Sequence, residues 1–397
     1  MGKKVSLKFT LTLMLLASAF TCLVLLLTIG RELGVFSGRY RYVREYAVLL
    51  SRIETLYIGE HDISETVTAA NRAAVASIGD QWSFYLTREE YSSVMERMTN
   101  RLPGIGIRVA PDEETGGIDI LYVYRGSAAE DAGLVFGDVI IAIDGEDITH
   151  LEFEEARSLF PRALGETIDL TVMRGDGSVE TLTAVFSIII VDPVTSYEML
   201  AGNIGYIALS NFDAGSADSF ISAVDRLIEQ GARAFIFDVR NNNGGRVTEL
   251  TRILDHLLPE GEIFISVDRR GVEEITRSGP ETIDLPAVVL VNRYSFSAAE
   301  YFAAMLQEYD YADVVGERTP GKGRSQLLLR LPGGSGLNIS TAEYLTKNRV
   351  SLYDTDGVTP DYEIDLTEEQ FARLRGRTLP QDEDPQLIGA LRLLQVY

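Results

Sequence analysis

A serine and a lysine in the C-terminal half of the sequence have surroundings suited to nucleophilic chemistry. Ser297 follows the apolar run 288–291 and precedes two alanines, so the sequence predicts a buried strand, a sharp turn and a helix that begins at the serine. The first N–H groups of a helix have no partner within it, so the N–H of Ala298 could hold an oxyanion beside the Ser297 hydroxyl. Taken alone, Ser297 followed by Glu300 is better explained as a helix capping box.

Lys322 makes a catalytic role for Ser297 a better explanation than a capping role alone. It lies between Gly321 and Gly323, where the absence of side chains lets other backbone approach closely. A lysine can act as a general base near neutral pH only when it is uncharged, and burial favours the uncharged form by lowering the lysine pKa. A desolvated lysine beside a serine hydroxyl is the Ser–Lys variant of the catalytic triad. We therefore predict Ser297 as a nucleophile and Lys322 as its base.

Two short runs also resemble a known family. Ser-Phe-Ser-Ala-Ala-Glu at 295–300, followed by Thr-Pro-Gly-Lys-Gly at 319–323, is similar to the signature of the carboxy-terminal processing peptidases, or tail-specific proteases. The resemblance implies a catalytic serine at Ser297 and a catalytic lysine 25 residues later (322 − 297 = 25), at Lys322. It also implies that Gln326, four residues further on, orients the lysine.

A third run, Phe-Asp-Val-Arg-Asn-Asn-Asn-Gly-Gly at 237–245, resembles a strand end of the same family. The resemblance implies a second oxyanion donor at the N–H of Gly244, with Gly245 as the neighbouring alternative. The glycines could instead serve only as a turn that Asp238 and Arg240 fix by pairing. Asn243 stands where the family usually has proline, which does not alter the predicted nucleophile or base.

Residues 102–187 are predicted to form a unit of short strands with small helices at 126–134 and 153–164 and a closing hairpin of 167–173 and 179–185. Its run Ser-Ala-Ala-Glu-Asp-Ala-Gly-Leu, followed by Gly-Asp-Val-Ile-Ile-Ala-Ile-Asp-Gly, resembles a bacterial, circularly permuted PDZ domain. The resemblance implies that a glycine-bearing loop binds the C-terminal carboxylate of a peptide, which then adds as a strand to a sheet edge. The predicted peptide-binding residues are Gly104, Ile105, Gly106 and Ile107. The alternative is that these glycines only permit a tight turn.

The N-terminus carries one long apolar segment. Residues 9–29 are uncharged, which is enough to cross a bilayer as a helix, and three lysines in residues 1–8 favour a cytoplasmic N-terminus. The competing interpretation is a cleaved signal peptide, because 17–19 has the small-residue pattern of a cleavage site. We expect an uncleaved single-pass anchor in the cell membrane and an extracytoplasmic catalytic domain.

The sequence therefore predicts a multidomain α/β protein. Its expected parts are a transmembrane helix at 9–29, a helical region at 30–101, a PDZ domain at 102–187, a peptidase core at 188–365 and a helical tail at 366–397. Within the core, apolar strand-like runs such as 204–209 alternate with helical runs such as 247–257 and 298–308, which is typical of an α/β fold. The family resemblance implies that this core is crotonase-like.

Charge and composition narrow the function. The net charge is −23, from 36 basic and 59 acidic residues, which argues against nucleic acid as a partner. One cysteine, Cys22, allows no disulfide within the chain. The three histidines are far apart in the sequence, which argues against a His-dependent triad or a metal site. No metal or cofactor is implied, and no oligomeric state is specified. We expect a serine endopeptidase that binds exposed apolar C-terminal tails of proteins.

Two further hypotheses stay open at this point. The chain could be a catalytically inactive, membrane-tethered PDZ adaptor that presents peptides without cutting them. Alternatively, the PDZ domain could gate the active site until a tail binds.

Overall fold

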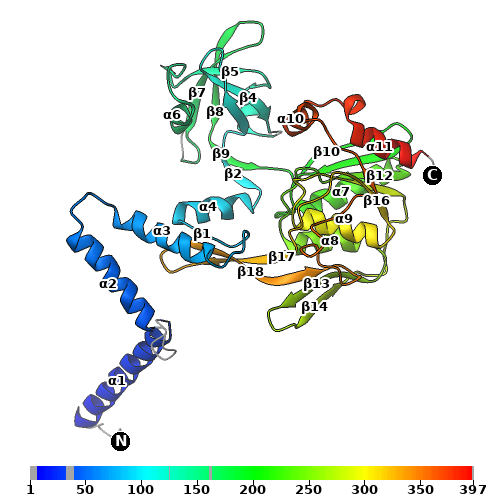
Figure 1. The fold of residues 1–397 in the computed structure, drawn as a ribbon. Coiled ribbons are helices and arrows are strands. Elements are labelled where there is room, and N and C mark those ends of the chain that lie inside the picture. Colours follow the sequence, from blue (N-terminus) through cyan, green and yellow to red (C-terminus); the bar gives the residue numbers. More distant parts are fainter. Residues whose placement is uncertain (1–6, 33–39, 125, 161–162, 396–397) are drawn as a thin grey trace, which may run out of the picture. The chain divides into compact units, whose positions relative to one another are not determined.

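The structure, a computed structural model, describes residues 7–32, 40–124, 126–160 and 163–395. The chain divides into two compact units, residues 1–77 and 78–397. In its described part, the first unit consists of three helices, labelled in Figure 1: α1 (Leu7–Glu32), α2 (Tyr40–Leu56) and α3 (Ile63–Ala76).

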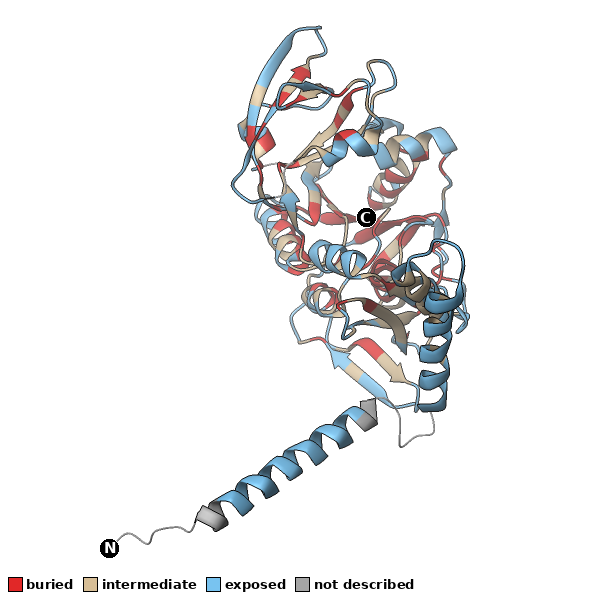
Figure 2. Ribbon diagram, turned by 90° about the vertical axis from the view of Figure 1, so that its left-hand side faces the viewer, coloured by how far each residue is buried: buried red, intermediate tan, exposed pale blue. Residues whose placement is uncertain are grey.

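Helix α1 covers the apolar segment that the sequence places at 9–29. The stretch Leu11–Ile29 is long and apolar enough to cross a membrane, and it is exposed along its length (Figure 2). Nineteen helical residues span about 28 Å, close to the hydrocarbon thickness of a bilayer. By length and composition, this helix could be a membrane span or a signal sequence. Most of the segment predicted to be cytoplasmic, 1–8, lies outside the described residues.

The region predicted to be a PDZ domain contains a six-stranded sheet, a separate two-stranded sheet formed by its first and last strands, and two short helices. Its strands are β2 (Arg101–Gly104), β3 (Ile107–Pro111), β4 (Ile118–Val123), β5 (Val139–Ile143), β6 (Glu146–Asp147), β7 (Thr167–Met173), β8 (Val179–Val185) and β9 (Ser187–Ile190). Its helices are α5 (Ala128–Asp131) and α6 (Phe153–Ser158). The hairpin of β7 and β8 has the predicted bounds. Helix α6 is shorter than the predicted 153–164.

Alternation along the strands builds the core of this region. In β7, Ile168, Leu170 and Val172 are fully buried, whereas the residues between them face outward or are half-buried. Successive side chains of a strand point to opposite faces, so these three residues pack together beneath the sheet.

The peptidase-like core is a six-stranded sheet in the order β10-β11-β12-β15-β16-β19. Strand β10 is antiparallel to β11, and the other neighbours are parallel. Its strands are β10 (Val194–Leu200), β11 (Ile204–Leu209), β12 (Ala234–Asp238), β15 (Ala287–Val291), β16 (Ala312–Gly316) and β19 (Tyr362–Glu363).

Helices cover both faces of this sheet, which explains why its central strands are apolar throughout. Phe235 and Phe237 of β12 point to one face, where they pack with α7 (Ser216–Glu229), α8 (Val247–Leu257) and α9 (Ala298–Glu308). Ile236 points to the other face, which α11 (Pro385–Leu394) covers with Leu387 and Ala390. The bounds of β11, α8 and α9 are those that the sequence predicts.

A second sheet was not predicted. It has the order β1-β18-β13-β14, with β17 also paired to β18. Its strands are β1 (Phe84–Leu86), β13 (Glu262–Asp268), β14 (Glu273–Arg277), β17 (Arg324–Arg330) and β18 (Gly336–Leu345). Apart from Ile263–Ile265 in β13, most residues of these strands are exposed or half-buried, and β1 and β13 pair with β18 from distant parts of the sequence. The sheet matters for the site because β17 carries Gln326.

The stretch 30–101, which the sequence predicts to be helical, contains helices and one short strand. Besides α4 (Arg88–Arg97), it includes β1, which pairs with residues 336–338 of β18. The division between the two units falls at residues 77 and 78, so residues 78–101 belong to the second unit.

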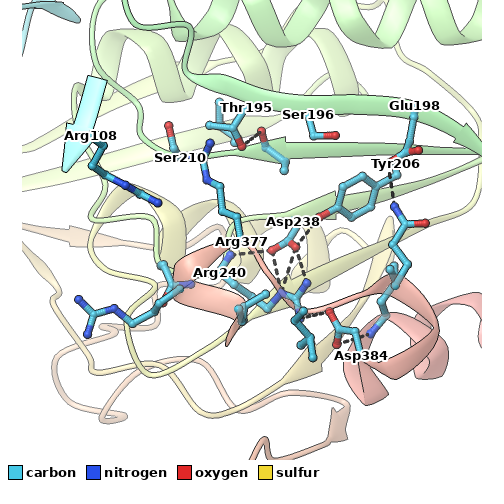
Figure 3. Close-up of a pocket in the computed structure, with 18 residues that line it drawn as sticks. Arg108, Thr195, Ser196, Glu198, Tyr206, Ser210, Asp238, Arg240, Arg377 and Asp384 are labelled. Carbon is cyan, nitrogen blue, oxygen red and sulfur yellow. Dashed lines mark hydrogen bonds and ion pairs between the residues drawn. The ribbon is translucent and has the colours of Figure 1, made fainter. Parts of the chain in front are cut away.

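The C-terminal segment is joined to the sheet by a buried ionic cluster (Figure 3). Residues 366–397 contain α10 (Glu368–Gly376), the short helix η2 (Gln381–Glu383) and α11. Arg240, just beyond β12, donates to Asp238 at 2.6 Å and to Asp384 at 2.8 Å, and all three side chains are buried. The predicted pairing of Asp238 with Arg240 is confirmed, and it extends to the helical tail.

Candidate active site

Ser297 lies at a strained turn between β15 and α9. Its φ of +55° and ψ of −113° fall outside the regions that a residue with a side chain normally adopts. Such backbone persists only where the surroundings enforce it, and it is concentrated at functional sites. Two contacts hold the turn: Ser295 Oγ donates to the carbonyl of Val239 at 2.8 Å, and the N–H of Phe296 donates to the carbonyl of Asn242 at 2.8 Å.

The glycine turn after β12 lies directly against the serine. A Cβ added to Gly244 would come within 2.8 Å of the Phe296 carbonyl oxygen and 2.9 Å of the Ala298 nitrogen, so only glycine fits there. The Gly244 N–H donates to Asn242 Oδ1 at 2.8 Å. Within the described residues, the N–H groups of Ala298 and Gly245 have no hydrogen-bond acceptor.

Lys322 reaches the same region from the loop after β16. A Cβ on Gly323 would lie 2.4 Å from the Tyr353 nitrogen, which confirms the close backbone approach expected at this glycine. Burial lowers the pKa of Lys322, and the Glu300 and Asp80 carboxylates oppose that change. No hydrogen bond joins Lys322 Nζ to Ser297 Oγ in the part of the chain that the structure describes. Its ammonium instead lies 4.7 Å from the centroid of the Trp82 ring.

Glu300 joins the serine turn to the lysine loop. Its side chain is fully buried, and its carboxylate accepts from the N–H groups of Ser297 at 2.7 Å, Gly321 at 2.6 Å and Lys322 at 3.0 Å. Burial raises the pKa of Glu300, and hydrogen bonds from the Thr319 side chain and these N–H groups oppose the rise. The capping-box bond to Ser297 is thus only one of three. The sequence motif gave no sign of the other two.

Gln326 lies on β17 and faces the same cavity. Its Nε2 donates to the Arg324 carbonyl at 2.6 Å and to Ser340 Oγ at 3.2 Å. In the described residues it makes no hydrogen bond to Lys322. The structure therefore brings Gln326 into the site without the direct contact to the lysine that the family resemblance implies.

Tyr344 of β18 is a buried neighbour of the serine that the sequence did not single out. Burial raises its pKa above the ordinary range, the Glu300 carboxylate adds to the rise, and the Ser297 side chain opposes it. Its hydroxyl has no hydrogen bond of ordinary geometry among the described residues. Tyr344 and Ser297 line the same cavity.

One cavity of about 920 Å³ contains all the predicted catalytic and oxyanion residues. Ser297, Lys322, Gln326, Gly244 and Ala298 line it together. Much of its remaining wall is apolar: Phe84, Val94, Met95, Met98, Leu102, Val247, Leu250, Phe264, Leu327 and Leu328. The arrangement can present an apolar peptide to a serine hydroxyl that has a partly desolvated amine and an unpaired N–H nearby.

The predicted peptide-binding loop lines a different cavity, of about 380 Å³. Gly104, Ile105, Gly106 and Ile107 all contribute to it. The carbonyls of Ile105 and Gly106 accept from the N–H groups of Ala129 and Tyr124 at 2.8 and 2.9 Å, so they point into the body of the region. Gly106 has φ of +96°, and a Cβ there would lie 2.2 Å from the Ser127 Cβ.

No group of three or more His, Cys, Asp or Glu side chains suited to a metal ion is found in residues 7–32, 40–124, 126–160 and 163–395.

Comparison with known families fits both regions. Residues 203–364 match peptidase family S41, and residues 120–174 match the PDZ domain. The match to S41 covers the glycine turn, Ser297, Lys322 and Gln326. The fold and the site thus define a serine-type peptidase with a PDZ domain.

Similarity to individual proteins narrows the family assignment. The chain is 33% identical over 335 residues to the carboxyl-terminal-processing protease of Synechocystis sp., covering 83% of this chain and 77% of that protein. It is 30% identical over 326 residues to the carboxy-terminal processing protease CtpA of Bacillus subtilis, covering 81% and 68%. The chain therefore belongs to the carboxyl-terminal-processing proteases of peptidase family S41.

A solved structure shares the fold. A protein from Bacteroides fragilis described as an S41 protease superposes with a TM-score of 0.59 at 21% identity. The match covers 86% of this chain and 92% of that one.

Proposed function

We propose that this chain is a membrane-anchored endopeptidase that binds the C-terminal tail of a protein through its PDZ domain and cuts with a Ser297–Lys322 dyad. The observation that carries the proposal is the Glu300 carboxylate, which bonds the N–H groups of both Ser297 and Lys322. One buried side chain thereby fixes the two loops at a shared cavity. A helix cap alone would need only the first of these bonds.

The proposed reaction begins with an uncharged Lys322. Its amine takes the Ser297 proton as Oγ attacks the scissile carbonyl, and it then protonates the leaving amine. Water completes deacylation with the same lysine as base. Because the amine makes no hydrogen bond to Ser297 Oγ here, it must move within reach when substrate binds, as is common for catalytic groups in unliganded enzymes.

The oxyanion would be held by backbone N–H groups from two loops. The Ala298 N–H is unpaired in the described structure and stands next to the nucleophile, so it is the first donor. Gly244 is the predicted second donor because it touches the serine turn, although Asn242 Oδ1 already accepts its N–H. Each such donor typically contributes about 3 kcal/mol to the transition state. Substituting Asn242 by Ala would remove this acceptor and free the Gly244 N–H for the oxyanion. We expect turnover to fall only by as much as the substitution distorts the turn.

A substrate strand would lie along β17. This strand pairs with β18 on one edge, and no other described strand pairs with it. Leu327 and Leu328 of β17 line the cavity beside Gln326. An extended peptide can add to such an edge through main-chain hydrogen bonds, and the apolar wall favours apolar side chains.

The decisive experiment compares two substitutions with a matched control. Ser297→Ala and Lys322→Ala should each abolish cleavage of a protein with an apolar C-terminal tail, followed by mass spectrometry, while circular dichroism stays unchanged. Lys347→Ala is the control, because Lys347 is exposed and lies over the Tyr309 ring away from the cavity. Substantial cleavage by either site variant would refute the dyad. A wild-type protein that binds tails but never cuts them would instead be the tethered adaptor.

The PDZ region would supply the tail-binding step. Its loop carbonyls point inward, which leaves a glycine-bearing turn facing a cavity of its own. Gating by this region is tested with the same substrate protein, with and without its apolar tail. Equal cleavage rates for the two forms would reject gating.

The anchor is proposed from α1, whose apolar stretch is long enough to span a bilayer. It would leave the catalytic unit outside the cytoplasm. Membrane fractionation followed by N-terminal sequencing tests this. A soluble mature protein that begins near Phe20 would identify the helix as a cleaved signal peptide.

A further inference from the structure

Trp82 is the only tryptophan of the chain, and it lies beside Lys322 and Phe296 although it comes from a distant part of the sequence. Strand β1 follows it directly and pairs with β18. Asn338 Nδ2 donates to the Trp82 carbonyl at 2.8 Å, and the Ser340 N–H donates to Ser83 Oγ at 3.0 Å. Trp82 and the residue after it are therefore held to the strand that carries Tyr344.

The indole contacts both halves of the proposed dyad region. Lys322 Nζ lies 4.7 Å from the ring centroid. The same ring meets Phe296, the residue before Ser297, edge-on at a centroid distance of 6.0 Å and an interplanar angle of 67°. The indole Nε1 is buried and has no hydrogen-bond partner among the described residues. The ring is thus held by packing alone, with its face toward the ammonium.

We propose that Trp82 is a positioning residue for the general base: its ring covers the Lys322 amine, excludes water from it and holds it over the turn that bears Ser297. This inference rests on the proposed Ser297–Lys322 dyad. No local sequence motif points to this role of Trp82.

Two effects of the ring on Lys322 oppose one another. Excluding water disfavours the ammonium, whereas the negative face of the ring attracts it. The other groups that face this lysine are the Glu300 carboxylate from α9 and the Asp80 carboxylate from the segment before β1, both of which favour the ammonium. Arg324 of β17 acts on Asp80 in turn.

We infer that water exclusion by the ring is the larger of the two effects. Burial is the first cause acting on the Lys322 pKa, and the net direction is downward despite both carboxylates. Removing the ring should therefore let water reach the amine and raise its pKa. The attraction lost at the same time would act in the opposite direction but is smaller than full hydration of an ammonium.

The test is the pH profile of kcat/KM for Trp82→Ala and Trp82→Phe. We expect the alanine variant to lose on the order of tenfold at pH 7 and to recover at higher pH, because its acid limb moves upward. The phenylalanine variant should keep the wild-type limb, since no hydrogen bond is lost with the indole nitrogen. Tyr309→Ala is the matched control: it removes an aromatic ring 4.0 Å from the Lys347 ammonium without touching the cavity.

A second measurement does not depend on turnover. In a Ser297→Ala background, acetylation of Lys322 with an amine-reactive reagent is followed against pH by mass spectrometry. The Trp82→Ala substitution should move the onset of labelling to higher pH. If that variant does not fold, Trp82→Leu, which still packs on Phe296 but leaves part of the amine uncovered, should give a smaller shift in the same direction.

The outcomes separate this inference from the dyad itself. If Lys322→Ala remains active, the proposed function fails. If Lys322→Ala is inactive while the Trp82 variants keep the wild-type acid limb and labelling onset, only the role of Trp82 is overturned. An equal loss at every pH in Trp82→Ala would also overturn it, because that result indicates a purely structural contact.

Discussion

Replacing Glu300 by glutamine tests whether one buried carboxylate aligns the two loops. In glutamine, one of the two carboxylate oxygens becomes an NH₂ group, which cannot accept from an N–H. Oε2 accepts from both Ser297 and Lys322, whereas Oε1 accepts from the Gly321 N–H. The less costly orientation keeps the amide oxygen at the Oε2 position and releases Gly321, at the base of the lysine loop.

The magnitude follows from the bonds lost. A hydrogen bond to a charged group contributes about 1.5–3 kcal/mol, so Glu300→Gln should lower the free energy of unfolding by about 2 kcal/mol. Loosening the lysine loop should matter more for turnover, because misplacing a catalytic group by about 1 Å can cost about 100-fold. We expect kcat to fall by roughly that factor with a much smaller change in KM.

The pH profile should move in a direction that simple unfolding does not produce. The Glu300 charge raises the Lys322 pKa, so removing that charge lowers it, and the acid limb of kcat/KM should shift to lower pH. Turnover thus falls although more of the lysine is uncharged at neutral pH. The assay is cleavage of a tailed protein from about pH 5 to about pH 10.

Glu308→Gln is the matched control for this prediction. Glu308 also lies in α9 and accepts from a loop, through Thr346 Oγ1 at 2.5 Å and the Asn348 N–H at 2.9 Å. Its substitution should cost some stability and leave the acid limb in place. Wild-type kcat together with an unmoved acid limb in Glu300→Gln would refute the alignment role.

Three further substitutions test other parts of the molecule. Burial raises the pKa of Asp213 to about 6 from 3.8, so the stability that this group contributes is present below about pH 3.8 and lost as pH rises to about 6. In urea unfolding, the free energy of unfolding of Asp213→Asn should therefore rise by on the order of 2 kcal/mol relative to wild type between pH 4 and pH 8. A difference between the two proteins that does not change with pH would contradict this. Arg240→Ala leaves two buried carboxylates unpaired and should cost about 3–5 kcal/mol, against about 0–1 kcal/mol for the exposed Arg252→Ala, by thermal unfolding. Gly106→Ala should weaken peptide binding measured by fluorescence anisotropy while cleavage of tail-less substrate persists, because a Cβ would lie 2.2 Å from the Ser127 Cβ.

Local sequence patterns predicted the parts of the fold that depend on local physics. Strands of the central sheet are buried on both faces, so they appear as continuous apolar runs, and the helices between them have a clear amphipathic period. That is why the bounds of α8 and α9 agree with the sequence. The strand–turn–helix at Ser297 follows from the same patterns, and the spacing to Lys322 came from the family resemblance.

Long-range pairing accounts for what was missed. Strands β17 and β18 are half-exposed, and β1 pairs with β18 across about 250 residues of sequence. No window of neighbouring residues contains that information. The roles of Trp82 and Glu300 are hidden for the same reason: each contacts the lysine loop only because the tertiary fold brings it there. Glu300 was recognised only as a cap, since that is the only contact its local motif specifies.

The half-exposed state of Lys322 also bears on how the site is switched on. Burial already lowers its pKa, although two carboxylates oppose the change, and the water that still reaches the amine also favours the ammonium. A peptide strand added along β17 would fill the cavity and displace that water. Binding would then complete the desolvation and free the amine to accept the serine proton. On this reasoning the substrate finishes assembling the base. Until a substrate fills the cavity, the amine stays partly hydrated and the site is less ready to cleave.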